Sequence, residues 1–290
     1  MRARLFARLL ALAMAGLLLG MQAPAACGVA QEGFIVGWGR NDSGQAAPPA
    51  GADFIAVDAG EYFNLALRGD GSLAAWGADW YGQVSGAPAG NDFTAIAAGS
   101  NYGLALRVDG SIVGWGRDDF GQASPPAGND FAVIAGGGVF GLALRTDGSV
   151  VGWGMDNFGQ ASPPAGNDFV AITAGWNHGL ALRTDGSLVS WGYDWGGSVT
   201  GTPVEDDFVA IAAGGNHSLA LRADGSMTAW GHNDYDAATS LPGSDFTAIA
   251  AGSYHNLALR ADGSIAGWGR DNYGQAEAPA GNDFIAISGG

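Results

Sequence analysis

The stretch LALRADGSIAGWGRDNYGQ, residues 257–275, decides the fold of this 290-residue chain. Two short apolar runs flank Asp262-Gly263, and Trp268-Gly269 ends the second run before a polar loop. An Asp-Gly pair between apolar runs favours a β-hairpin, because both central positions of a type I′ turn take positive φ. The stretch therefore predicts two antiparallel strands joined by a two-residue turn.

Versions of this stretch recur along the chain. Trp-Gly pairs follow one another at spacings of 38 or 39 residues, at Trp38, Trp76, Trp115, Trp153, Trp191, Trp230 and Trp268. An Asp-Phe pair follows each of them, at Asp53, Asp92, Asp130, Asp168, Asp207, Asp245 and Asp283. A nearly constant period of this length indicates a repeat architecture. The chain contains seven such units.

Each unit reads as three strands and a loop. In the unit that begins at residue 92, we expect strands over 92–97, 104–107 and 111–115, and no unit has apolar residues at helical spacing. The strands are apolar on both faces, so both faces of each sheet must be covered. Leucine on one face and alanine on the other favour stacking of identical sheets. The pattern predicts an all-β fold, a seven-bladed β-propeller of three-stranded repeats of about 38 residues. A right-handed solenoid is the alternative.

The two ends of the chain leave one unit unfinished. The repeats begin at 34–38, a third strand, and stop at 283–290, a first strand. Leu-Ala-Leu-Arg occurs six times, against seven Trp-Gly pairs at the repeat spacing. A ring that paired the terminal strands in one blade would remove open sheet edges, but that blade would lack its middle strand. We expect an incomplete closing blade, or about ten further LALR-like residues after Gly290.

The first 30 residues have the composition of a secretory leader. Three arginines precede the apolar run 9–20, and the small residues at 23–25 form a cleavage candidate. The run is too short to favour a membrane span. We expect residues 1–30 to form a signal peptide and short leader, and residues 31–290 to form the propeller, which would be secreted or periplasmic.

Cys27 is the only cysteine, which rules out an intrachain disulfide. Its small neighbours Ala25, Ala26 and Gly28 allow lipid modification as an alternative to simple secretion, although Pro24 stands where an aliphatic residue is usual. Cleavage after Ala30 would instead remove the thiol altogether.

The charge of the chain limits its partners. All 12 basic residues are arginines, 28 residues are acidic, and the formal net charge is −16. Loss of the three arginines of the leader would make the exported chain more acidic still. Nucleic acid and anionic membranes are therefore poor partners.

Residues 99–128 and 214–231 resemble repeats of the regulator of chromosome condensation superfamily. The closer likeness is to bacterial secreted seven-bladed propellers such as β-lactamase inhibitor protein II, which share Trp-Gly, Gly-Gln, Pro and Ala-Gly-x-x-His-x-Leu-Ala-Leu. The resemblance covers about residues 33–290. It implies a propeller that serves as a binding scaffold without a cofactor, with loops on one face that contact a protein partner. A nucleotide-exchange role at chromatin, known in the superfamily, does not fit an exported acidic chain.

The polar residues of the repeat read as structural. His178, His217 and His255 take the place of Phe or Tyr in other units, so we expect packing, with ring nitrogens bonded to local backbone, and no metal site. Only His232 lies outside this pattern. The Asp-rich loops lack the spacing of a calcium loop, and their carboxylates are expected to satisfy turn backbone groups. We expect glutamines to bridge backbone groups between blades, at Gln45, Gln83, Gln122, Gln160 and Gln275. The arginine of Leu-Ala-Leu-Arg is expected to be solvated.

Two sets of residues vary between units: the pair after each repeat glycine, and the loop after each Trp-Gly. Loops on a rigid scaffold commonly carry function, and exposed Trp and Tyr beside Asn are typical of contact surfaces. The predicted partner-binding residues are Tyr62, Trp80, Asn101, Trp176, Asn177, Trp195, Asn216 and Tyr254. A further set of aromatic residues shares one register and is read as packed: Tyr81, Phe120, Phe158, Tyr235 and Tyr273. The loops at 193–205 and 232–242 depart most from the repeat sequence. We interpret this departure as sequence drift slightly in preference to a binding site.

The main hypothesis is a monomeric, exported, non-catalytic scaffold for a protein partner, with β-lactamase inhibition as a narrower form. A surface module that stacks Trp and Tyr on polysaccharide is the alternative. No catalytic set is apparent, because Ser, His and Asp occupy positions that every unit shares, whereas a catalytic centre needs unique residues in mutual reach. A single buried carboxylate with a strongly raised pKa in the central channel would favour an enzyme instead.

Overall fold

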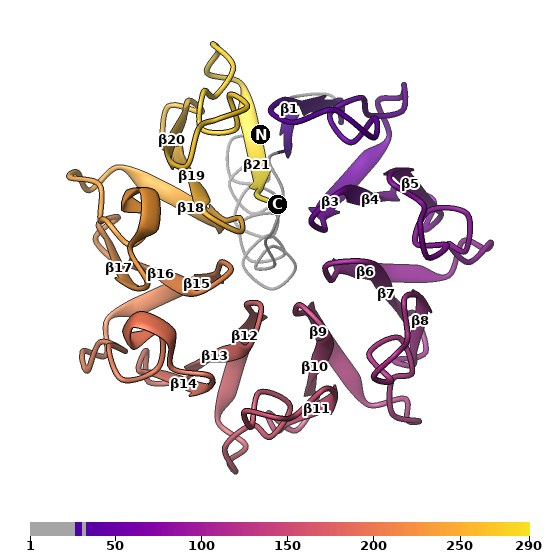
Figure 1. Cartoon of the computed structure of the whole chain (residues 1–290), viewed down its shortest axis with the longest axis horizontal. Coiled ribbons are helices and arrows are strands. Elements are labelled where there is room, and N and C mark those ends of the chain that lie inside the picture. Colours follow the sequence, from indigo (N-terminus) through magenta and orange to yellow (C-terminus); the bar gives the residue numbers. More distant parts are fainter. Residues whose placement is uncertain (1–26, 31–32) are drawn as a thin grey trace, which may run out of the picture.

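The chain forms a ring of small antiparallel sheets around a central axis (Figure 1). The computed structural model describes residues 27–30 and 33–290, and the only helical elements there are two 3-10 turns, η1 (Trp195–Gly197) and η2 (Asp234–Asp236). Six repeats each supply one three-stranded sheet. The predicted all-β repeat fold is confirmed, and the strands of the unit at residue 92 begin and end within two residues of their predicted limits. The predicted two-residue type I′ turn is wrong. Only Gly110 of the Asp109-Gly110 pair has a positive φ, of 82°, and the amide of Arg107 donates to the carbonyl of Ser111 at 2.8 Å, so the hairpin loop has three residues.

Within each repeat sheet the strands run in sequence order from the centre of the ring to its rim (Figure 1). The inner strands are β3 (Phe54–Ala59), β6 (Phe93–Ala98), β9 (Phe131–Gly136), β12 (Phe169–Ala174), β15 (Phe208–Ala213) and β18 (Phe246–Ala251). The middle strands are β4 (Phe63–Arg68), β7 (Tyr102–Arg107), β10 (Phe140–Arg145), β13 (His178–Arg183), β16 (His217–Arg222) and β19 (His255–Arg260). The outer strands are β5 (Leu73–Gly77), β8 (Ile112–Gly116), β11 (Val150–Gly154), β14 (Leu188–Gly192), β17 (Met227–Gly231) and β20 (Ile265–Gly269).

A further sheet joins the two ends of the chain. Strand β1 (Cys27–Ala30) lies between β2 (Ile35–Gly37) and β21 (Phe284–Ser288) and pairs antiparallel with both. The expectation that this sheet lacks a middle strand was wrong. Cys27 pairs with Gly37 as Leu142 pairs with Gly152, so residues 27–30 occupy the register of Leu-Ala-Leu-Arg. The solenoid alternative is also wrong, because the first and last strands share a sheet.

Neighbouring sheets pack through their middle strands. Leu142 and Leu144 of β10 lie in one buried cluster with Ala181 of β13 and with Ile172. The same arrangement of two leucines against the next alanine recurs for Leu65 and Leu67, among others. The predicted stacking of a bulky face on a flat face is therefore confirmed. The core is spread over the seams between sheets instead of lying inside any one of them.

In six of the seven seams the repeat tryptophan donates a hydrogen bond to the preceding loop. Trp115 Nε1 donates to the carbonyl of Gln83 at 2.9 Å, and the equivalent bonds at Trp76, Trp153, Trp191 and Trp230 span 2.9–3.2 Å. Trp38 Nε1 donates to the carbonyl of Gln275 at 3.1 Å, which ties the first repeat to the last. Trp268 Nε1 is buried without a partner. The repeat tryptophan is thus a polar link between sheets as well as a core residue.

The glutamine side chains do not bridge blades as expected. Gln83 Oε1 accepts a bond from the amide of Tyr81 in the same loop, and Gln122 Oε1 does the same for Phe120. It is the main-chain carbonyl of each glutamine that reaches the next blade through the tryptophan. The side chain fixes the loop that presents this carbonyl.

The repeat arginines are bound, so the expectation that they are solvated was wrong. Antiparallel pairing places Arg107 opposite Phe93, and its Nη1 donates to Asp92 Oδ2 at 2.5 Å. Its guanidinium also lies over the Phe93 ring, 4.9 Å from the centroid. Five further repeats have the same arrangement, at Arg68, Arg145, Arg183, Arg222 and Arg260. In each of these six repeats, the Asp carboxylate and the Phe ring therefore bind the guanidinium group of the arginine that follows 15 positions later.

Three buried histidines line successive seams, as their exchange with Phe and Tyr predicted. His178 Nε2 lies 2.9 Å from Ser218 Oγ, and His217 Nε2 lies 2.7 Å from Asn256 Oδ1. These partners belong to the next blade, which corrects the expectation of local backbone bonds. His255 Nε2 is buried without a partner. Burial lowers the pKa of all three histidines to about 4.

One carboxylate, Asp58, is buried between inner strands. Asp58 Oδ2 accepts a bond from the amide of Ala98 in β6 at 2.8 Å, and Ser288 Oγ of β21 donates to Oδ1 at 3.2 Å. Burial raises its pKa to about 8. Asp58 therefore connects three successive inner strands.

Asp58→Asn should change how stability depends on pH. The folded pKa lies above its ordinary value, so the contribution of Asp58 is fully present below about pH 4 and is lost as pH rises through 8. We expect the free energy of unfolding of the wild type, relative to the variant, to fall between pH 5 and pH 9. Denaturant titrations across this range measure it, with Asp283→Asn, an exposed acid, as a control that keeps the wild-type slope. Parallel curves for wild type and Asp58→Asn would contradict the assignment.

His255→Phe should make the chain more tolerant of acid. Phe63 and Phe140 hold this position in other repeats, and His255 Nε2 has no bond to lose. A histidine with a lowered folded pKa loses stability as pH falls from 6.5 towards 4, because the unfolded chain binds the proton more readily. We expect the variant to gain about 2–3 kcal/mol over the wild type at pH 4, and little at pH 7.5. Thermal unfolding at both pH values checks this, and an equal effect at both would point to packing alone.

Candidate functional site

The two variable loops of each repeat lie at the same end of the ring. The loop after each repeat glycine accepts, through a main-chain carbonyl, a bond from the loop that follows Trp-Gly. Asn101 receives it from the amide of Arg117 at 3.0 Å, and Asn177 from Tyr193 at 2.8 Å. Equivalent bonds join Tyr62 to Ala78, Asn216 to His232 and Tyr254 to Arg270. All eight predicted partner-binding residues therefore come from loops on one face, whereas the Asp-Gly turns lie at the other ends of the strands.

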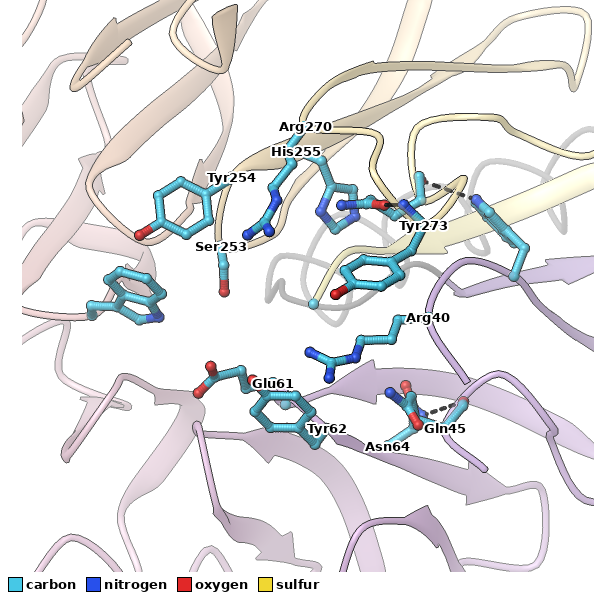
Figure 2. A pocket seen from close by; sticks show the side chains of 15 residues that line it. Arg40, Gln45, Glu61, Tyr62, Asn64, Ser253, Tyr254, His255, Arg270 and Tyr273 are labelled. Carbon is cyan, nitrogen blue, oxygen red and sulfur yellow. Dashed lines mark hydrogen bonds between the residues drawn. The ribbon is translucent and has the colours of Figure 1, made fainter. Parts of the chain in front are cut away.

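A hollow on this face lies over the junction of the first and last repeats. It has a volume of about 160 Å³, and its walls include Tyr62 and Arg40 from one side and Tyr254, Arg270 and Tyr273 from the other. Figure 2 shows their side chains arranged around the hollow, with Glu61 and Ser253 at its edge. We call this the junction pocket. It brings together three of the predicted residues, Tyr62, Tyr254 and Trp176.

Trp176 reaches the junction pocket from two blades away. Its ring meets that of Tyr254 edge-on at 5.2 Å between centroids, although a complete repeat separates the two residues. Gly215 makes this possible: a Cβ atom there would lie 3.1 Å from the indole ring. The amide of Trp176 also donates to the carbonyl of Gly215 at 3.0 Å. A residue without a side chain in the intervening repeat thus lets the tryptophan extend across it.

Tyr62 and Trp80 form a second contact at the pocket edge. Their ring centroids are 5.1 Å apart, and Trp80 is 62% exposed. The Arg40 guanidinium lies 5.2 Å from the Tyr62 centroid and 5.0 Å from that of Tyr273. Arg40 thereby links the aromatic residues of the first and last repeats by cation–π contacts.

Trp195 belongs to a separate aromatic cluster further round the ring. It lies 5.8 Å from Tyr193 and 5.7 Å from His232, and Tyr193 in turn lies 4.4 Å from Phe158. Its loop carries η1, and the next loop carries η2, in which Tyr235 and Asp236 take positive φ of 60° and 62°. The two loops that depart from the repeat therefore both build the aromatic surface of this face.

The predicted asparagines do not join either cluster. Asn101, Asn177 and Asn216 are half-buried, and their main-chain carbonyls connect the two loops of their own repeats. Asn101 Oδ1 is buried without a partner. The described contacts of these asparagines thus stabilise the loops of their own repeats.

The five aromatics that share one register are exposed, so the expectation that they are packed was wrong. The exposed fractions of Tyr81, Phe120, Phe158, Tyr235 and Tyr273 are 47–52%, similar to the 47% of Trp195. In the loops that contain the repeat glutamine, the backbone of the aromatic residue stabilises the loop. The amide of Tyr81 donates to Gln83 Oε1, and the amide of Tyr273 donates to Gln275 Oε1. The rings project from the face and extend its aromatic surface.

The electrostatics of the junction pocket combine two arginines with one acid. Desolvation by surrounding protein raises the pKa of Glu61, against the opposing effects of its bond to Tyr62 and the charge of Arg40. Desolvation also raises the pKa values of Tyr62 and Tyr254, so both phenols stay protonated near neutral pH. Sequence reasoning missed Arg40, Glu61 and Arg270, because each varies between units without being aromatic.

The described residues do not assemble a metal site. No group of three or more His, Cys, Asp or Glu converges on one point in the part of the chain that the structure describes. Asp58 is a buried carboxylate with a raised pKa, the feature that would favour an enzyme, but it is 3% exposed and both oxygens bond across the seams. It does not line the junction pocket. Asp79, Asp118 and Asp156 bond to amides of their own loops, in agreement with the structural interpretation. No described helix is long and apolar enough to span a bilayer.

Comparison with solved structures shows the fold in other proteins. The ectodomain of the receptor kinase ACR4 from Arabidopsis thaliana is 20% identical, with a TM-score of 0.72 over 90% of this chain and 98% of the other. The ectodomain of the receptor kinase CR4 from Physcomitrella patens is 23% identical, with a TM-score of 0.70 over 86% of this chain and 72% of the other. Prp20p from Saccharomyces cerevisiae, described with its binding to Gsp1p and histones, is 20% identical, with a TM-score of 0.69 over 95% and 88%. No curated protein sequence matches the chain.

The repeats themselves match a known family. The regulator of chromosome condensation (RCC1) repeat matches residues 93–122, 131–160, 169–194, 208–236 and 246–275, which together make up half of the chain. These matches run from the inner strand of each repeat to the loop after Trp-Gly. The chain therefore belongs to the regulator of chromosome condensation (RCC1) repeat family.

Proposed function

We propose that this protein is an exported, non-catalytic scaffold that binds a protein partner through the face that carries its variable loops. We call this surface the aromatic face. It comprises ten aromatic residues from the variable loops: Tyr62, Trp80, Trp176, Trp195, Tyr254, Tyr81, Phe120, Phe158, Tyr235 and Tyr273. The observation that carries the proposal is the gathering of these rings from all six complete repeats at one end of the ring. Exposed Trp and Tyr are the residues that most often dominate protein interfaces.

The chemistry of the aromatic face supports a protein as the ligand. Its rings are held by contacts within and between repeats, so little side-chain freedom is lost when they are covered. The contacts Trp176–Tyr254 and Tyr62–Trp80 are examples. A net charge of −16 disfavours nucleic acid. Yeast RCC1 (Prp20), which shares the fold, has been crystallised bound to Kap60, so a propeller of this kind is compatible with protein binding.

Partner capture should depend on the aromatic face. Trp176→Ala and Tyr62→Ala should each lower recovery of a partner by tenfold or more, because truncation of a central aromatic commonly costs about 2 kcal/mol. The measurement is a pull-down of extracellular proteins with the mature chain, quantified by mass spectrometry. Val108→Ala is the control, since Val108 is 74% exposed but follows Arg107 at the opposite end of the ring. Equal recovery of the same partner by all variants would remove Trp176 and Tyr62 from the site.

A polysaccharide is the second candidate ligand. Trp80 is 62% exposed, and its neighbour Tyr81 is 47% exposed, so both rings are available to stack on sugars. A glycan array probed with the mature chain distinguishes the two ligands. A blank array beside a clear protein partner would reject the polysaccharide.

We also propose that the mature protein is a monomeric ring of seven blades, closed by β1. The support is the pairing of Cys27–Ala30 with both β2 and β21. Cleavage near Ala25 would keep this strand, whereas cleavage after Ala30 would remove it. The exported chain should therefore start at or before Cys27.

Deletion of the closing strand should destabilise the ring. A chain that lacks residues 1–30 should unfold at least about 5 °C below one that lacks residues 1–26, because β2 and β21 would lose their shared partner. Thermal unfolding of the two truncated chains gives the difference, and sedimentation reports association through the exposed edges. Equal melting temperatures and equal masses would contradict closure by β1.

A further inference from the structure

Arg270 stands apart from the other arginines of the described chain. Eight of the nine arginines between residues 33 and 290 form ion pairs with Asp, at Arg40, Arg68, Arg107, Arg117, Arg145, Arg183, Arg222 and Arg260. Arg270 has no ion pair within this range, and its Nε is buried without a hydrogen-bond partner. A buried guanidinium nitrogen without an acceptor is costly. Arg270 therefore lacks the internal carboxylate that pairs with each of the other eight arginines.

The sequence of its loop explains why Arg270 is unpaired. Arg40 and Arg117 occupy the equivalent position after Trp-Gly, and each donates from Nε to an Asp two residues later, at 2.7 Å. In the last repeat the residue two positions after the arginine is Asn272. The neighbouring Asp271 is already used, because its Oδ1 accepts the amide of Ala276 at 2.8 Å. A single Asp-to-Asn difference between repeats leaves this one guanidinium without a carboxylate.

The surroundings of Arg270 hold it in the junction pocket. Its guanidinium lies 5.4 Å from the Tyr235 ring centroid and 5.8 Å from that of Tyr254. Figure 2 shows the guanidinium groups of Arg270 and Arg40 directed towards the middle of the pocket, with Tyr254 and Tyr273 beside them. Glu61 lies across the pocket from Arg270, on the side of Tyr62. A small anionic group that entered here would meet aromatic walls and fixed guanidinium donors.

We infer that the junction pocket receives an acidic side chain, Asp or Glu, of the protein partner, with Arg270 as its ion-pair donor. The inference rests on the proposed function and names the chemistry that the partner must present. A pocket of about 160 Å³ has room for a single carboxylate side chain. Planar guanidinium groups match carboxylates in geometry and bind them by charge-assisted bonds. Because the chain as a whole is strongly acidic, the acid must enter as one protruding side chain and not as part of an acidic surface.

A random dodecapeptide display library, selected on the secreted chain, tests this inference. Peptides selected on the wild type should be enriched in Asp or Glu at one position by roughly fivefold over the input library. The enrichment should fall to the input level on Arg270→Ala. It should also fall on Asn272→Asp, which supplies the internal carboxylate that Asp42 and Asp119 supply elsewhere. Arg117→Ala is the matched control, because Arg117 has the same loop position but already pairs with Asp119 and lies outside the pocket.

The possible results distinguish a failure of the Arg270 inference from a failure of the proposed protein-binding function. Asn272→Asp changes one exposed loop residue, so equal melting temperatures of variant and wild type would show that the fold is intact. Selected peptides without acidic enrichment, or with the same enrichment on Arg270→Ala, would overturn the inference and leave protein binding in place. No selected peptide on the wild type, together with no captured partner, would overturn the proposed function and the inference with it.

Discussion

The structure depends on the hydrogen bond that six of the seven repeat tryptophans, all except Trp268, donate to the carbonyl of the preceding loop. No sheet in this ring has a core of its own, since three short strands bury their apolar faces only against the next sheet. The Leu-against-Ala packing supplies most of the burial, but apolar contact alone is non-directional. The indole N–H bond to Gln83, Gln122 or their equivalents fixes how far one sheet is rotated on its neighbour. Propagated around the ring, this constraint brings Trp38 to Gln275 and closes the chain on itself.

The features that recur in every unit were predictable from the sequence. The Asp-Gly pair, the alternation of Leu and Ala, and the Trp-Gly period locate the hairpins, the strands and the stacking, because each is a local or periodic signal. The type of the Asp-Gly turn was predicted wrongly, because only its glycine takes a positive φ. The Arg–Asp pairs were not recognised, since the two residues are 15 positions apart and meet only through antiparallel pairing. The closing strand was missed for a different reason. Cys-Gly-Val-Ala shares little with Leu-Ala-Leu-Arg, and it adjoins a segment with the composition of a leader.

The candidate site was predictable as a face but not as a set of contacts. Variation between units located the loops, whereas Trp176 and Tyr254 are 78 positions apart and meet only because Gly215 lies between them. Exposure was harder to judge. Tyr81 and Tyr273 recur at one register because their amides are bonded, and recurrence alone does not distinguish a conserved backbone from a packed ring. The sequence does contain the difference that sets Arg270 apart, since Asn272 stands where Asp42 and Asp119 stand in other repeats. The structure shows its consequence, which is an arginine without a carboxylate partner.

The position of the junction pocket has a consequence for cooperativity. Its walls come from residues 38–64 near one end of the chain and from residues 253–275 and Gly290 near the other, and Trp176 reaches in from between. Any opening of the ring along the terminal sheet takes these walls apart. Occupancy of the pocket and closure of the chain are therefore linked equilibria: a ligand that spans both walls stabilises the closed ring by mass action, and the ring in turn preorganises the ligand's contacts. The sheet that contains the two shortest described strands, β1 and β2, would be the one that binding reinforces.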